Sequence, residues 1–156
     1  LQYNLISAGE VSVGATVNGT ALTPQTMTVA GGSDVTFLVT GNSAADAQVV
    51  QVADDNRLPT IETKYKLRLH ATPSLAADNL TLTVDYSPIA SDLPFARASP
   101  FTSLLANSAA ALEVTSPSSV TPPYSVTDVN LVAKGVYTVF LFDTAAGPSG
   151  VLRKDR

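Results

Sequence analysis

The sequence predicts an all-β protein built as a β-sandwich, and three observations carry this prediction. Charged residues make up only 14% of the 156-residue chain, below the roughly 25% usual for globular domains. Polar positions are filled mainly by Thr, Ser and Asn beside the β-branched Val, which favours strands over helices. Short apolar runs recur between loops rich in Pro, Ser and Gly, a spacing typical of sandwiches.

Strand signals are clearest in the second part of the chain. The segment 136–143 is apolar on both alternating faces, as expected of a central strand buried between layers. Its counterpart in the first part of the chain is 35–39. The six strands predicted in the second part are 64–71, 80–86, 110–115, 129–133, 136–143 and 150–153. Long loops that contain proline or serine are predicted at 72–79, 87–100 and 116–125, and any recognition is expected there.

An internal repeat sets the predicted domain plan. Residues 27–57 and 129–156 each contain an apolar strand end, a glycine turn, a strongly apolar strand, an Ala/Gly-rich loop, a second strand and a charged stop. The turns lie at 31–32 and 134–135, where glycine is expected to supply a positive φ. An Asn18-Gly19 hairpin signal precedes the turn in the first copy. We therefore predict two tandem repeats.

The boundary between the repeats is predicted after residue 59, with a linker at 58–62. The first repeat then covers 1–59 and the second, complete repeat covers 60–156. Residues 65–105 precede the repeated unit in the second copy and have almost no counterpart in the first, so the first repeat is expected to be incomplete at its N-terminus. Three explanations stay open: a fragment, the loss of the opening strands, or a sheet completed by strands from elsewhere.

Charge and composition exclude several classes of partner. Residues 1–59 hold five acids and one base, and residues 60–156 hold eight of each, which gives −4 and 0. No positive field attracts nucleic acid, so nucleic acid is not an expected partner. No apolar stretch approaches the roughly 18 residues needed to cross a bilayer, so no transmembrane segment is expected in this chain. The absence of Cys removes disulfides and thiolate chemistry.

Three segments resemble the bacterial domain of unknown function 4397 family. They are KLRLHATPSLAADNLTLTVD at 66–85, FARASPFTSL at 95–104 and GVYTVFLFDTAAGPSGVLRKDR at 135–156. The likeness covers 60–156 well and 1–59 as a partial earlier copy. The resemblance implies an immunoglobulin-like or transthyretin-like sandwich and an extracytoplasmic location, whether periplasmic, cell-surface or secreted. It brings no catalytic residues.

The strand 64–71 offers one candidate binding face. Strand alternation sends Lys64, Lys66, Arg68 and His70 to the same side. Such a row could bind an anionic polymer such as an acidic surface glycan. A second interpretation is protective, because lysines on an edge strand block edge-to-edge pairing. His70 itself is expected near a turn, with a hydrogen bond to nearby backbone.

The sequence contains no pattern that favours a catalytic or metal-binding site. His70 is the only histidine, so a zinc site or a Ser-His-Asp relay would depend on it alone. Asp143 stands in a Phe-Asp-Thr-Ala segment that lacks the glycine of aspartic proteases, and it is predicted to be a turn residue that ends a strand. The oxygen-rich residues 54–56 are consecutive, which favours a turn over a calcium site. We expect no enzyme activity, no cofactor and no metal.

Three functional hypotheses follow. The first is a non-enzymatic extracytoplasmic cell-envelope module that acts as a structural spacer or a binding domain. The second is a subunit of a surface fibre or larger assembly formed by β-strand addition. The third is a hydrolase on a sandwich scaffold, whose turnover would be lost in His70→Ala or Asp143→Asn. Self-association, another envelope protein and a surface glycan are the partners considered.

Overall fold

The chain folds into β-strands connected by turns and loops. The structure is a computed structural model, and it describes residues 4–41, 43–71, 79–94, 97–144 and 146–156. Every regular element in these ranges is a β-strand, so the predicted all-β class is confirmed. None of the described segments forms a helix of the length and apolar character that a bilayer crossing requires.

Contacts within the chain separate two compact units. The N-terminal unit covers residues 2–55, and the C-terminal unit covers residues 56–156. This division lies four residues before the boundary predicted after residue 59. Each unit has its own sheets and is described by itself.

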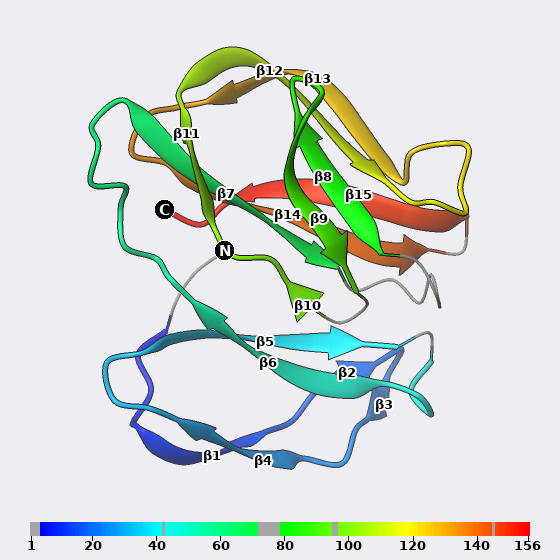
Figure 1. Cartoon of the computed structure of the whole chain (residues 1–156). Coiled ribbons are helices and arrows are strands. Elements are labelled where there is room, and N and C mark those ends of the chain that lie inside the picture. The colour runs from blue at the N-terminus through cyan, green and yellow to red at the C-terminus, as the bar shows by residue number, and fades with distance from the viewer. Residues whose placement is uncertain (1–3, 42, 72–78, 95–96, 145) are drawn as a thin grey trace. The chain divides into compact units, whose positions relative to one another are not determined.

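The C-terminal unit contains nine strands among its described residues, arranged in two sheets (Figure 1). In the five-stranded sheet, β10 (Arg97–Ala98) and β11 (Thr102–Leu105) both pair with β7 (Lys64–Ala71), which is followed by β14 (Val136–Thr144) and β15 (Gly147–Lys154). The four-stranded sheet has the order β13 (Tyr124–Leu131), β12 (Asn107–Thr115), β8 (Leu80–Val84) and β9 (Ser87–Leu93).

Strands β7 and β14 are the two central strands of the five-stranded sheet. They pair in parallel, from Val136 beside Lys66 to Leu141 beside Ala71, whereas the other strand pairs of the described residues are antiparallel. The second edge of β14 pairs with β15. The central position predicted for the segment 136–143 is therefore confirmed within its sheet, although Phe142, on the face away from the core, is 39% exposed.

The hydrophobic core of the C-terminal unit draws side chains from both of its sheets. The strands β7 and β14 contribute alternate residues, because only one face of each strand points at the other sheet. Burying each large aliphatic side chain stabilises the fold by roughly 1.5–3 kcal/mol. Core residues with no measurable exposure are Leu67, Leu69, Ala71, Leu82, Ala110, Val114, Leu131, Val139 and Leu141.

The N-terminal unit consists of three antiparallel strand pairs among its described residues. These pairs are β1 (Gly9–Val13) with β4 (Gln25–Val29), β2 (Thr16–Val17) with β3 (Thr20–Ala21), and β5 (Asp34–Thr40) with β6 (Gln48–Asp54). Its buried apolar side chains in the described part are Val29, Val49 and Val52. This core is much smaller than that of the C-terminal unit.

The predicted Asn18-Gly19 hairpin is confirmed as the connection between β2 and β3. Asn18 has a φ of 49° and Gly19 a φ of 82°. Positive φ at both central residues is the requirement of a two-residue type I′ turn, which Asn-Gly satisfies with little strain.

Several sequence-based boundaries are wrong. The strand predicted at 129–133, after a loop at 116–125, is β13, which begins at Tyr124 and ends at Leu131. The segment predicted as a loop at 87–100 contains β9 and β10. Pro88 is tolerated there because β9 is an edge strand, which pairs only with β8 among the described residues. The strand predicted at 80–86 ends at Val84, because Asp85 (φ 48°) and Tyr86 (φ 66°) form the turn into β9. Most of the loop predicted at 72–79 lies outside the described residues.

The turns before β5 and β14 correspond closely but use different residues. In each, an amide closes the turn on a carbonyl three residues earlier: Ser33 on Ala30 at 3.2 Å, and Gly135 on Val132 at 3.1 Å. The positive φ falls on Gly32 (73°) in the first turn and on Lys134 (62°) in the second. The prediction that glycine supplies this φ is therefore wrong for the second turn.

Gly135 serves a different purpose, which is close packing. A Cβ at this position would lie 2.3 Å from Cε2 of Tyr137, so only glycine leaves room for that ring. The Tyr137 hydroxyl in turn accepts a hydrogen bond of 3.0 Å from the amide of Val132. The tyrosine thus ties the turn to β14.

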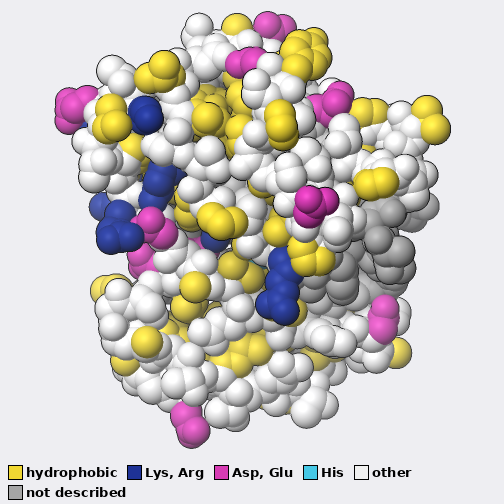
Figure 2. All heavy atoms as spheres, in the orientation of Figure 1, with side chains coloured by type: hydrophobic (Ala, Val, Ile, Leu, Met, Phe, Trp, Pro, Cys, Tyr) yellow, Lys and Arg dark blue, Asp and Glu magenta, His cyan; other side chains and the backbone are white. Residues whose placement is uncertain are grey.

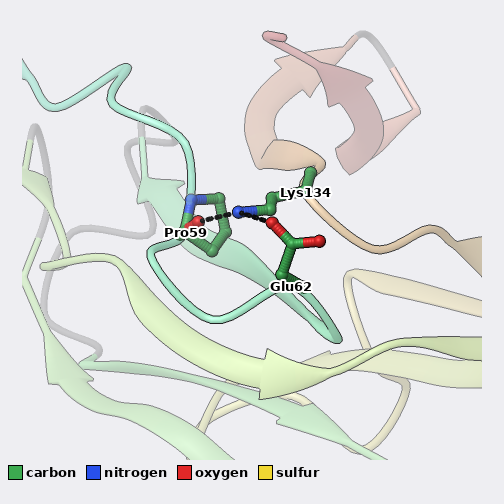
Figure 3. Close-up of polar contacts among 3 residues, drawn as sticks. All are labelled: Pro59, Glu62 and Lys134. Atoms are coloured by element: carbon green, nitrogen blue, oxygen red, sulfur yellow. Dashed lines mark hydrogen bonds and ion pairs between the residues drawn. The ribbon is translucent and has the colours of Figure 1, made fainter.

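The Lys134 side chain fastens the segment that leads into β7. Its Nζ donates to the carbonyl of Pro59 at 3.0 Å and lies 3.2 Å from Oε1 of Glu62 (Figure 3). Glu62 is 90% exposed, so the ion pair itself contributes little to stability. Part of the predicted linker at 58–62 is therefore held against the C-terminal unit.

Candidate functional site

The cationic row of β7 is largely buried. Lys66, Arg68 and His70 are 9%, 2% and 0% exposed, and Lys64 is half-buried. The edge position assumed for this strand is wrong, because β7 pairs with β14 along one edge and with β10 and β11 along the other. Alternation identifies residues that share a face, but it does not say what covers that face.

Phe101, in the segment between β10 and β11, packs against two of these cations. Its ring centre lies 4.9 Å from Nζ of Lys66 and 4.5 Å from Cζ of Arg68. Both distances suit cation–π attraction, which is stronger when the cation is removed from water. Ser99 fixes the same segment, since it exchanges hydrogen bonds of 2.9 and 3.0 Å with the backbone of Leu69. The aromatic cover over the row is thus anchored on β7 itself.

Arg68 begins a chain of hydrogen bonds that runs across the sheet. Its Nε donates to Oγ1 of Thr138 at 3.0 Å, and that hydroxyl donates to Oδ2 of Asp155 at 2.6 Å. The amide of Asp155 donates to the carbonyl of Val136 at 2.7 Å. A buried guanidinium requires such partners to offset its lost hydration. This series of hydrogen bonds connects β7 and β14 to the C-terminal segment.

His70 is the penultimate residue of β7 and is fully buried, and the segment that follows β7 lies outside the described residues. The His70 ring stacks on Phe140, with 5.6 Å between ring centres and 18° between ring planes. The two residues are directly paired in the parallel register of β7 and β14. Asp143, the other residue of the hydrolase hypothesis, is the penultimate residue of β14 and pairs with Pro148 of β15.

On the core side of β7, Tyr65 is 1% exposed and packs edge-on against Tyr137, with 5.9 Å between ring centres. Burial raises the pKa of the Tyr65 hydroxyl to about 12, and the negative charge of Asp85 and the Tyr137 hydroxyl add to this rise. Burial also raises the pKa of Tyr124, which a hydrogen bond with the Leu152 backbone partly opposes. Both phenols therefore stay protonated at neutral pH.

The acidic segment 54–56 is divided between the two units. Asp54 is the last residue of β6 and accepts a hydrogen bond from the Thr36 hydroxyl. Asn56 is 5% exposed, and its carbonyl accepts a bond of 3.4 Å from Arg156. Across the described ranges, no cluster of three or more His, Asp or Glu side chains could hold a metal ion.

Most of the Lys and Arg side chains visible in Figure 2 gather at the left of the view, where some lie beside Asp or Glu, and another stands apart near the centre. A feature of a different kind is formed by the strand edges of the N-terminal unit, which the strand-addition hypothesis considers. In the described part of that unit β5 pairs only with β6, and β1 pairs only with β4. The signal that pointed toward it was the missing counterpart of residues 65–105 in the first repeat.

No family model matches this chain, and no curated protein matches it. The resemblance to the domain of unknown function 4397 family stays a prediction from the three segments quoted above.

Proposed function

We propose that this chain is a non-enzymatic cell-envelope module that works outside the cytoplasm as a structural spacer or binding domain. The observation that carries the proposal is the internal use of the cationic row. Arg68 is engaged by Phe101 and Thr138, and Lys66 packs on the same Phe101 ring. These groups stabilise a scaffold, and recognition is then left to loops and strand edges.

The proposal includes two tandem sandwich repeats of the immunoglobulin-like or transthyretin-like type. The paired turns before β5 and β14 support it, as do the equivalent hydrogen bonds from Thr36 to Asp54 and from Thr138 to Asp155. The extracytoplasmic location rests on low charge and an abundance of Thr, Ser and Ala, together with the family resemblance.

Binding of a soluble acidic polysaccharide, polygalacturonate, to the full chain and to Lys64→Ala and Arg68→Met tests the proposal. The scaffold role predicts that Arg68→Met lowers the unfolding temperature and that any polysaccharide binding does not depend on Lys64. Binding that Lys64→Ala abolishes at unchanged stability would assign the row to glycan recognition. Turnover of ester, peptide or glycoside substrates, lost in a folded His70→Ala variant, would replace the proposal with the hydrolase hypothesis.

A second candidate is a subunit of a surface fibre or larger assembly formed by β-strand addition. The specific observation in its favour is the one-sided pairing of β5 and β1 in the described part of the N-terminal unit. Unpaired strand edges offer rows of backbone donors and acceptors to an added strand. Light scattering behind size exclusion, over a wide concentration range and with candidate partner strands added, tests this candidate. A chain that stays monomeric and captures no strand would count against it.

A further inference from the structure

We propose that β5 is the acceptor edge for a strand that pairs parallel to it, donated by another polypeptide and carrying the alternation of β7. The donated strand would have apolar residues at the places of Leu67 and Leu69 and a cation at the place of Arg68. This inference rests on the assembly candidate above and specifies its edge, orientation and partner.

The first step is the equivalence of β5 and β14. Each begins two residues after a turn residue of positive φ, Gly32 or Lys134. Each forms an antiparallel hairpin with the next strand, β6 or β15. Counted from these turns, Thr36 takes the place of Thr138, and each threonine donates its hydroxyl to an aspartate of the segment that follows. The two hairpins thus share backbone and side-chain contacts.

The second step is a difference between these equivalent strands. In the C-terminal unit, β14 has β15 on one edge and β7, in parallel, on the other. In the described part of the N-terminal unit, β5 has only β6. The position beside β5 that corresponds to β7 holds no strand among the described residues. A strand placed there would repeat a pairing that the same chain already makes.

The exposure of apolar side chains on β5 also indicates that a strand is missing beside it, at the place that corresponds to β7. Phe37 is half-buried and Val39 is 44% exposed. Their counterparts on β14, Val139 and Leu141, are both 0% exposed, because β7 and the facing sheet cover them. Covering apolar surface contributes about 25 cal/mol per Å², so a strand that shields these residues gains affinity from burial as well as from backbone hydrogen bonds.

The chemistry of the partner follows from the residues that hold β7. Arg68 donates to Thr138, and Thr138 donates to Asp155. In the N-terminal unit, Thr36 and Asp54 form the same threonine–aspartate hydrogen bond, which is the part of this series that accepts the bond from the arginine. Residues 1–59 also carry five acids against one base, a balance that favours a cationic partner. An arginine or lysine opposite Thr36 would therefore find acceptors already positioned.

The donor is expected to be another polypeptide and not β7 of a second copy. In its own sheet β7 pairs on both edges and supplies Leu67 and Leu69 to the core at 0% exposure. Donating it would dismantle the C-terminal unit.

The test uses the ¹⁵N-labelled full chain and a synthetic peptide with the sequence of residues 64–71, KYKLRLHA, carrying a nitroxide at one end. Parallel pairing predicts that a label at the peptide N-terminus broadens amide signals near Asp34 and that a label at the C-terminus broadens those near Thr40. A control peptide with lysine in place of both leucines carries more positive charge, so nonspecific attraction would make it bind more tightly. We expect it to bind at least tenfold more weakly.

Two matched variants locate the edge. Val39→Asp places a charge opposite the alanine that ends the peptide, the counterpart of Ala71, and is expected to weaken peptide binding at least tenfold. Val120→Asp makes the same change at a residue of the C-terminal unit that is 103% exposed, and it is expected to leave binding unchanged.

The outcomes separate this inference from the assembly candidate. Antiparallel broadening, or broadening at β14 or β1, overturns the inference and leaves strand addition standing. Self-association that Val39→Asp removes, without peptide binding, identifies a second copy as the occupant and also overturns it. A monomeric chain that binds no peptide overturns both proposals.

Discussion

Thr138 donates its hydroxyl proton to Asp155 across 2.6 Å, and this bond has a counterpart in the other unit, where Thr36 donates to Asp54. In both units the threonine lies on the apolar strand of a hairpin and the aspartate lies in the strand or segment that follows. The C-terminal bond has one further component, because Thr138 also accepts from Arg68. The hydroxyl therefore links β7 to the end of the chain.

Thr138→Val is expected to destabilise the C-terminal unit by about 1–3 kcal/mol, because the isosteric change leaves Arg68 and Asp155 each without one buried hydrogen-bond partner. Thr127→Val is the control, since Thr127 is exposed on β13 of the same unit. Urea unfolding followed by tyrosine fluorescence measures both. Equal stability of the two variants would show that the Thr138 hydroxyl has no structural role.

Arg68→Ala is expected to be more severe, with a loss of about 3 kcal/mol or more, because it removes a buried cation together with its contact on Phe101. Arg97→Ala removes the same side chain from an exposed position on β10 and is expected to change stability by less than about 0.5 kcal/mol. Chemical denaturation of both variants at neutral pH provides the comparison. A neutral Arg68→Ala would contradict the scaffold role on which the proposed function rests.

The sequence predicted strands most accurately where the local pattern was strong. The predicted bounds of β7, 64–71, agree with the structure, and the central position of β14 followed from apolar residues on both faces. The strand β9 was missed because Pro88 suggests a loop, and only its place at a sheet edge makes a proline compatible with it. That place depends on pairing with β8, which no local pattern encodes.

The sequence predicted which residues of the candidate site share a face, but it did not predict what surrounds and buries them. Alternation correctly placed Lys66, Arg68 and His70 on one face of β7. Their burial depends on Phe101 and on the parallel partner β14, which lie about 30 and 70 residues further along the chain. Sequence periodicity reports neither contact, so a buried cationic row was interpreted as an exposed one.

Gly135→Ala is expected to destabilise the C-terminal unit by about 1–3 kcal/mol, because the added Cβ would meet the Tyr137 ring at 2.3 Å. Movement of that ring would also disturb the hydrogen bond from the Val132 amide. Gly31→Ala is the matched control: its φ is not positive, and a Cβ there would make only an ordinary 3.8 Å contact with Ala8. It is expected to be neutral or slightly stabilising. Thermal unfolding of both variants tests the contrast, and a neutral Gly135→Ala would contradict the packing requirement.

Stability is expected to fall in alkaline solution because of Tyr65. The folded protein raises the pKa of this hydroxyl from 10.0 to about 12, so the folded state retains the proton more firmly than the unfolded state does. The resulting stabilisation is fully present below pH 10, declines as pH rises from about 10 to 12, and is lost above the folded pKa. Guanidinium unfolding at intervals between pH 8 and 12 measures this decline.

Tyr65→Phe separates this effect from the other groups that titrate in the same range. The substitution keeps the ring against Tyr137 and removes the ionisable hydroxyl, so the free energy of unfolding is expected to fall less steeply above pH 10 than in the unmodified chain. Tyr86→Phe is the control, because the Tyr86 side chain is 90% exposed. We expect that variant to follow the unmodified chain across the whole range. If Tyr65→Phe also follows the unmodified chain, then Tyr65 does not govern the alkaline loss of stability.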